Sequence, residues 1–170
     1  MLKENNNYPI RKHPRLKNYD YSQNGSYHIT ICTKNKECLL GKVVFNQQAS
    51  DVIKIHLSPY GIIVDKYIQR IDLVYKYIKV DKYVIMPNHI HLLLSINQPL
   101  DVLMNKNQKH VNVETVVRTF KRMVTREVGK SIWQESFYDT VLEDDHAYYS
   151  AYEYIENNPV CWIADKYYSE

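Results

Sequence analysis

Two histidines separated by one apolar residue are the side chains of this chain best suited to chemistry. His89 and His91 lie in the segment 86–94, which reads MPNHIHLLL. Side chains alternate between the faces of a β-strand, so both imidazoles should project from one face, about 7 Å apart along the chain. The opposite face is apolar and would anchor the strand in a core through Ile90, Leu92, Leu94 and Ile96. Two imidazoles on a rigid strand can hold one divalent cation, although two surface histidines on a half-exposed strand would read the same way.

A second candidate set lies near the C-terminus, where residues 154–159 read YIENNP. Tyr154 and Asn158 are spaced to lie on one face of a helix. A tyrosine hydroxyl, with its pKa near 10, is a poor nucleophile at neutral pH, but a cation that polarises a phosphate lowers the barrier to its attack. A histidine pair plus an amide oxygen on the tyrosine's own helix would couple metal and nucleophile. An aromatic helix capped by Asn158 is the alternative, which we prefer for Tyr148, Tyr149 and Tyr152.

Two groups of basic residues are candidates for contact with a phosphate backbone. One follows a predicted helix over 113–129, off its apolar stripe, and consists of Arg118, Lys121, Arg122 and Arg126. The other lies in an N-terminal arm that its prolines keep extended, and consists of Arg11, Lys12, Arg15 and Lys17. Such charges usually form a solvated surface, but Arg118 and Arg122 are four residues apart and could follow a phosphate backbone.

The elements that must position these side chains follow from periodicity. Alternating, β-branched segments predict strands over 26–33, 39–45, 50–56, 79–86, 89–96 and 133–141. Helices are expected over 58–73, with Ile63, Tyr67 and Ile71 on one face, over 113–129 and over 144–158, with a polar loop at 98–110. This order predicts an α+β fold, a ferredoxin-like antiparallel sheet with helices packed on one face. We expect a single domain over 1–170, with a basic arm at 1–20 and a tyrosine helix at 144–158.

Composition sets outer bounds. The chain has 170 residues and a formal net charge of +3, which suits one domain with a real core and does not by itself indicate nucleic acid. Its three cysteines form no C-x-x-C pair, so neither a disulfide framework nor a zinc knuckle is indicated. No apolar run approaches the length of a membrane span. We therefore expect a cytoplasmic protein without a membrane partner.

Taken together, the motifs resemble those of the single-tyrosine transposases of the HUH superfamily, and especially the REP-associated tyrosine transposases, relatives of the insertion-sequence-200 transposases. The resemblance spans nearly the whole chain. It rests on residues 86–91 (MPNHIH), 133–134 (WQ), 137–138 (FY) and 154–159 (YIENNP), and on residues 11–16, 19–21 and 27–33 near the start.

The resemblance implies an enzyme that nicks and rejoins single-stranded DNA containing a hairpin from a palindromic repeat. By this analogy His89 and His91 hold Mg²⁺ or Mn²⁺, with Asn158 as the third ligand and Asn157 and Glu156 as fallbacks. Tyr154 would attack the phosphate and form a 5′-phosphotyrosine link. The resemblance leaves a monomer and a homodimer open, because insertion-sequence relatives resemble swapped dimers and repeat-associated ones look monomeric.

Three other functions fit parts of the sequence. A non-catalytic nucleic-acid-binding module could stack bases on sheet aromatics such as Tyr27 and Tyr83. A zinc-dependent hydrolase would use the histidine pair, but it lacks a convincing carboxylate ligand and leaves Tyr154 unused. A replication or conjugation initiator shares the histidine pair but usually has a larger, multidomain chain.

Overall fold

A four-stranded antiparallel sheet forms the centre of the molecule, with strand order β4-β5-β1-β6. The computed structural model describes residues 19–45, 53–104, 111–162 and 167. The sheet strands are β1 (Gly25–Cys32), β4 (Ile78–Ile85), β5 (His89–Ile96) and β6 (Tyr138–Leu142), and a separate two-stranded ribbon consists of β2 (Gly41–Phe45) and β3 (Ile53–Leu57). The helices are α1 (Pro59–Ile68), α2 (Ile71–Val74), α3 (Leu100–Met104), α4 (Val113–Val128) and α5 (Asp145–Asn157).

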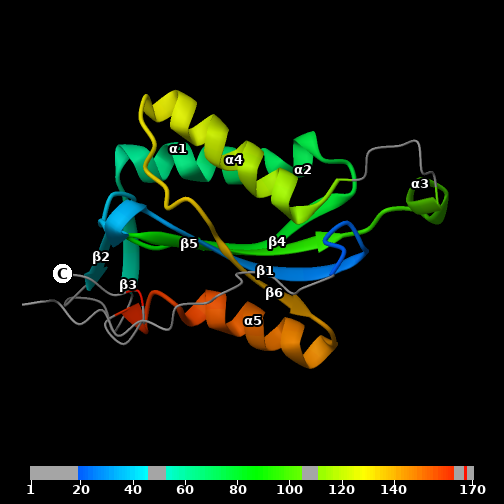
Figure 1. Cartoon of the computed structure of the whole chain (residues 1–170). Helices are drawn as coiled ribbons and strands as arrows, with labels where there is room; N and C mark the ends of the chain where they lie inside the picture. Colours follow the sequence, from blue (N-terminus) through cyan, green and yellow to red (C-terminus); the bar gives the residue numbers. More distant parts are fainter. Residues whose placement is uncertain (1–18, 46–52, 105–110, 163–166, 168–170) are drawn as a thin grey trace, which may run out of the picture.

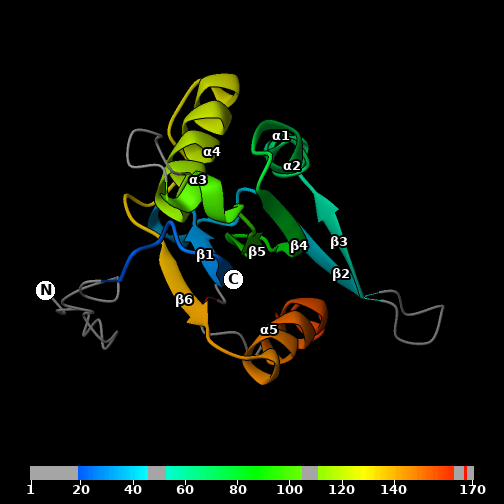
Figure 2. The same cartoon turned by 90° about the vertical axis from the view of Figure 1, so that its right-hand side faces the viewer.

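The chain order β1-α1-β4-β5-α4-β6 and the strand order confirm the ferredoxin-like fold. As expected, α1 and α4 lie on one face of the sheet, where they cover the main core (Figure 1). The expectation of one helical face does not extend to α5, which lies on the opposite face (Figures 1 and 2). The cause is visible in β5, where Leu92 faces the main core and Leu93 faces a second cluster with Ala151 and Ile155.

The helix ends follow the capping signals of the sequence. The Ser58 hydroxyl accepts a hydrogen bond from the Gly61 amide and Pro59 begins α1. Asn112 caps α4, and Gly129 ends it in the left-handed conformation at φ 81°. Asp144 caps α5 by accepting from the Ala147 amide. The Asp144 cap fixes where the tyrosine helix begins.

Several expected features differ from the structure. The first helix ends at Ile68, and Ile71 begins the separate helix α2. The buried stripe of α1 contains Val64 and Ile68, whereas Ile63 and Tyr67 are only partly buried. The expected loop over 98–110 contains α3, and its residues 105–110 lie outside the described part of the chain.

The last strand begins at Tyr138 rather than at residue 133. Before the strand, the carbonyl groups of residues 134–136 accept hydrogen bonds from the Lys121 ammonium group. Trp133 keeps a single bridge, to Thr33. Among the described residues, no helix combines the length and the apolar character needed to cross a membrane.

Candidate catalytic centre

The two histidines of β5 project from the face that α5 covers, and their ring nitrogens converge. His89 pairs with Cys32 of β1, and His91 pairs with Thr30. The His89 Nε2 and His91 Nε2 atoms are 3.1 Å apart. The side chains of Ile90, Leu92, Leu94 and Ile96 lie in the main core on the other face, as the alternation predicts. Because His89 is 0% and His91 1% exposed, they are not two surface histidines.

Asn88 determines which nitrogen of His89 carries the proton. The Asn88 Nδ2 donates to the carbonyl groups of Lys36 at 3.1 Å and Tyr167 at 2.6 Å. The amide oxygen must therefore be the atom that lies 2.8 Å from His89 Nδ1, and an oxygen acceptor requires a proton on Nδ1. In the neutral ring, Nε2 is then the unprotonated nitrogen and points at His91, which is the tautomer that a metal ligand needs.

His91 is oriented from the neighbouring strand. Its Nδ1 lies 2.9 Å from the Thr30 hydroxyl and 3.1 Å from His28 Nε2. Both partners come from β1, on the same face as the histidine pair. These contacts direct Nε2 of His91 toward Nε2 of His89, so each ring is held by a partner at its Nδ1 atom.

The geometry fits a shared divalent cation. If two ligand atoms each lie about 2.1 Å from one ion and the ligand–ion–ligand angle is about 90°, the two atoms are about 3.0 Å apart. This is close to the 3.1 Å between His89 Nε2 and His91 Nε2. The described residues contain no cluster of three or more His, Cys, Asp or Glu side chains that could hold a metal. A third metal ligand from the described residues would therefore have to come from another type of side chain, such as an amide oxygen.

Tyr154 lies over the histidines. Its ring centroid is 5.2 Å from that of His91 and 5.8 Å from that of His28, with the rings edge to face. The Tyr154 side chain is 40% exposed, so it is accessible to a large substrate. A surface pocket beside it is lined by Ser150, Glu153, Tyr154, Asn157, Asn158 and Cys161.

The three residues considered as a third ligand differ in their surroundings. Asn158 caps the C-terminal end of α5 and is 1% exposed. Glu156 is exposed and forms an ion pair with Lys82 of β4 at 2.9 Å, and Asn157 is exposed. Burial therefore favours Asn158.

The aromatic rings of Trp162 and Tyr167 cover His89, a contact that was not predicted from the sequence. The Tyr167 ring centroid lies 4.7 Å from that of His89, and the Trp162 ring centroid lies 6.0 Å away. Both residues are 6% exposed. The contacts of His28 and Asn88 with the histidine pair were not predicted either. The alternation of His28 and Thr30 along β1 does indicate that these two side chains share one face.

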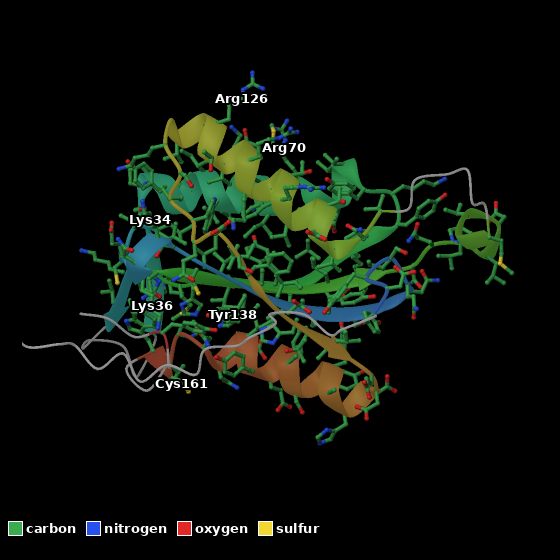
Figure 3. The ribbon with its side chains drawn as sticks, viewed as in Figure 1. Lys34, Lys36, Arg70, Arg126, Tyr138 and Cys161 are labelled. Carbon is green, nitrogen blue, oxygen red and sulfur yellow. The ribbon has the colours of Figure 1, made fainter. Side chains whose placement is uncertain are left out.

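The basic residues of α4 lie on the other side of the sheet. Arg118, Arg122 and Arg126 are exposed, and Figure 3 shows Arg126 on the outer side of the helical layer, away from Tyr138 and Cys161. The structure does not bring them to the histidine pair. The expected arm contacts Arg11, Lys12 and Arg15 lie outside the described residues.

Lys121 has local partners. Its ammonium group donates to the carbonyl oxygens of Gln134 at 2.5 Å, Glu135 at 2.9 Å and Ser136 at 3.4 Å. Burial lowers the pKa of Lys121 below its ordinary value. Its contribution to DNA binding stays a prediction, and its contribution to the loop before β6 is visible.

The two tyrosines considered as a stacking platform, Tyr27 and Tyr83, lie on the face of the sheet that α1 and α4 cover. Tyr27 is 0% exposed and its hydroxyl donates to the Gln23 carbonyl at 2.8 Å. The Tyr83 hydroxyl donates to Asp65 of α1 at 2.8 Å. Neither ring is placed to stack on a base, which weighs against the non-catalytic binding module.

Comparison with known proteins gives a consistent result. The family model described as "Transposase IS200 like" matches residues 21–158. An uncharacterised protein of Haemophilus influenzae is 35% identical over 174 aligned positions, which cover 93% of each chain. A solved REP-associated tyrosine transposase bound to a REP hairpin is similar in fold, with a TM-score of 0.59 and 18% identity over 86% of this chain and 73% of that one.

Proposed function

This chain belongs to the IS200-like transposase family, whose members cleave and transfer DNA, and on that premise we propose that it nicks and rejoins hairpin-containing single-stranded DNA through a 5′-phosphotyrosine intermediate. The observation that carries the proposal is the position of Tyr154, whose ring centroid lies 5.2 Å from that of His91. The solved REP-associated tyrosine transposase that is similar in fold was bound to a REP hairpin, which supports the choice of substrate form.

We assign Tyr154 as the nucleophile, and His89, His91 and Asn158 as the residues that would hold Mg²⁺ or Mn²⁺. When bound, the cation would withdraw charge from the scissile phosphate and fix its position. Asn88 and Thr30 orient the imidazoles, and Tyr154 and the histidines come from one chain, so a monomer contains this set of residues.

The covalent step exchanges one ester for another. The Tyr154 Oη attacks phosphorus and loses its proton to solvent, the bond from phosphorus to the 3′-oxygen breaks, and that oxygen leaves as a 3′-hydroxyl after taking up a proton. Because the tyrosyl ester conserves the phosphodiester bond energy, attack by a 3′-hydroxyl can rejoin the strand without a nucleotide cofactor.

The exposed arginines of α4 are proposed as contacts for DNA that runs along the α1–α4 layer. The sheet separates α4 from α5, the helix that carries Tyr154 (Figure 1), so these arginines are not contacts for the phosphate under attack. The arm residues Arg11, Lys12 and Arg15 remain proposed phosphate contacts as well.

The test of this function is a covalent adduct. Hairpin DNA from palindromes flanking the gene, labelled on the 3′ side of the cut, should form a denaturation-resistant adduct with the wild-type protein and Mn²⁺. Tyr154→Phe removes only the nucleophilic oxygen, so we expect no adduct while DNA binding is retained. The matched control is Tyr149→Phe on the same helix, where the side chain is 63% exposed, and it should form the adduct normally. An adduct with Tyr154→Phe would refute the choice of nucleophile, and no adduct with the wild type on any such hairpin would refute the proposed chemistry.

A further inference from the structure

The ribbon β2–β3 has two chemically different faces. Lys42 lies opposite His56 and Val44 lies opposite Lys54, so these four side chains share one face. Lys42, Lys54 and His56 are exposed, and neither strand of the ribbon contains an Asp or Glu. We call Lys42, Lys54 and His56 the basic ribbon face.

The other face of the ribbon determines where the basic face points. It carries Val43 opposite Ile55, and Gly41 opposite Leu57. Leu57 is partly buried and packs against the main core. Because the apolar face is the one that meets the core, the basic ribbon face is directed away from it, toward solvent.

Hydrogen bonds join the base of the ribbon to the histidine strand. Leu40, which precedes β2, donates its amide to the carbonyl of Pro87 at 2.9 Å, and Ser58, which follows β3, donates its amide to the Leu40 carbonyl at 2.9 Å. A Cβ atom at Gly61 would lie 2.0 Å from the Leu40 oxygen, so α1 approaches this point closely. Since Pro87 is two residues before His89, the ribbon is positioned relative to the catalytic centre by a short, well-packed connection.

The ribbon also extends to the correct side of the molecule. Both views show β2 and β3 extending beyond the sheet toward the side that α5 occupies (Figures 1 and 2). Lys34 and Lys36 lie at the end of the sheet from which the ribbon extends (Figure 3). The α4 arginines lie on the opposite side, so the ribbon is a basic surface on the same side of the sheet as α5, the helix that carries Tyr154.

We propose that the basic ribbon face binds the sugar-phosphate backbone of the paired stem of a DNA hairpin while the adjoining single strand enters the catalytic centre. This inference rests on the proposed function and adds the surface that holds the stem. A two-stranded ribbon fits the major groove of a duplex. Lys42 and Lys54 are diagonal neighbours, roughly 7–8 Å apart at Cα, so both ammonium groups can reach one backbone. Contacts of this kind position the DNA and do not read its sequence.

The test compares Lys42→Gln/Lys54→Gln with the wild type on two labelled DNAs, a stem-loop with a single-stranded flank and an oligonucleotide of equal length whose second arm is scrambled. Log affinity falls with log salt by about 0.9 per phosphate contact, so relative to 1 M salt each contact raises the affinity about 5.5-fold at about 0.15 M salt. Losing two contacts should therefore weaken stem-loop binding roughly 30-fold. The slope of log affinity against log salt should fall by about 1.8. Binding of the unpaired oligonucleotide should stay close to that of the wild type.

Two control variants separate charge from structure. Lys42→Arg/Lys54→Arg keeps the charges and should retain stem-loop affinity. Lys76→Gln/Lys79→Gln makes the same change of charge at two exposed positions that lie outside both the ribbon and the α1–α4 layer, and should bind the stem-loop like the wild type.

The outcomes distinguish this inference from the function on which it rests. If the wild type prefers the stem-loop and forms the Tyr154 adduct, but Lys42→Gln/Lys54→Gln binds the stem-loop equally well, the ribbon does not hold the stem. If that variant instead changes the oligomeric mass with unaltered stem-loop affinity, the ribbon is an interface between copies of this chain, and the inference is also overturned. Failure of the wild type itself to prefer the stem-loop would count against the proposed function.

Discussion

Replacing Asn88 tests the tautomer of His89. The Asn88 side chain accepts from His89 Nδ1 at 2.8 Å and donates to two carbonyls at 3.1 and 2.6 Å. In Asn88→Ala the His89 ring loses the acceptor that keeps its proton on Nδ1. Loss of such a partner behind a ligating histidine typically costs 10–100-fold in metal affinity, and we expect Mn²⁺ affinity to fall by about that factor.

The same contacts set the expected loss of stability. Three hydrogen bonds at about 1 kcal/mol each give a loss of about 3 kcal/mol in the free energy of unfolding. For a chain of this size that corresponds to a melting temperature lower by roughly 6–12 °C. Stability is measured by thermal unfolding without metal, and affinity by calorimetric titration with Mn²⁺ at a temperature where the variant is folded.

Gln98→Ala is the matched control for Asn88→Ala. Gln98 is 4% exposed and its side-chain amide donates to the carbonyls of Ser22 at 2.9 Å and Val111 at 3.4 Å. It follows the end of β5 that lies opposite His89, so Gln98→Ala should lose stability and keep its Mn²⁺ affinity. The reasoning about the tautomer would be refuted if Asn88→Ala bound Mn²⁺ as tightly as the wild type, or if Asn88→Ala and Gln98→Ala lost Mn²⁺ affinity equally.

Two further predictions concern residues outside the centre. Lys121→Ala should lower the free energy of unfolding by about 2 kcal/mol, because its ammonium group donates to three carbonyls before β6, whereas the exposed Arg122→Ala should change it by less than about 0.5 kcal/mol; equal melting temperatures would contradict this. Burial raises the pKa of Tyr27 above its ordinary value, so the folded chain keeps this phenol protonated where the unfolded chain loses the proton, and stability should fall as pH rises above about 10. Urea titrations at about pH 9 and about pH 11 should show a smaller fall in Tyr27→Phe, and an equal fall would contradict the assignment.

Local patterns predicted most of the fold. The alternation around His89 and His91, the caps at Ser58 and Asp144, and the glycine at 129 each describe interactions between residues near in sequence. Such signals do not depend on the rest of the chain, so the strands, the two long helices and the topology could be predicted from them.

Features that depend on distant contacts could not be predicted in this way. The position of α5 depends on Leu93, whose burial on the second face of β5 is indistinguishable in sequence from burial in a single core. The cover over His89 comes from Trp162 and Tyr167, more than 70 positions along the chain. The partners of Lys121 are backbone carbonyls, which carry no sequence signal.

The two faces of the sheet differ in how firmly they hold their helices. α5 rests on a small cluster in which Leu93, Ala151 and Ile155 are buried, whereas α1 and α4 share the main core. Local opening requires less free energy where fewer apolar contacts are lost. The helix that carries Tyr154 should therefore open locally at a lower cost in free energy than α1 or α4. The proposed nucleophile then belongs to a less stable cooperative unit than the two histidines that it faces.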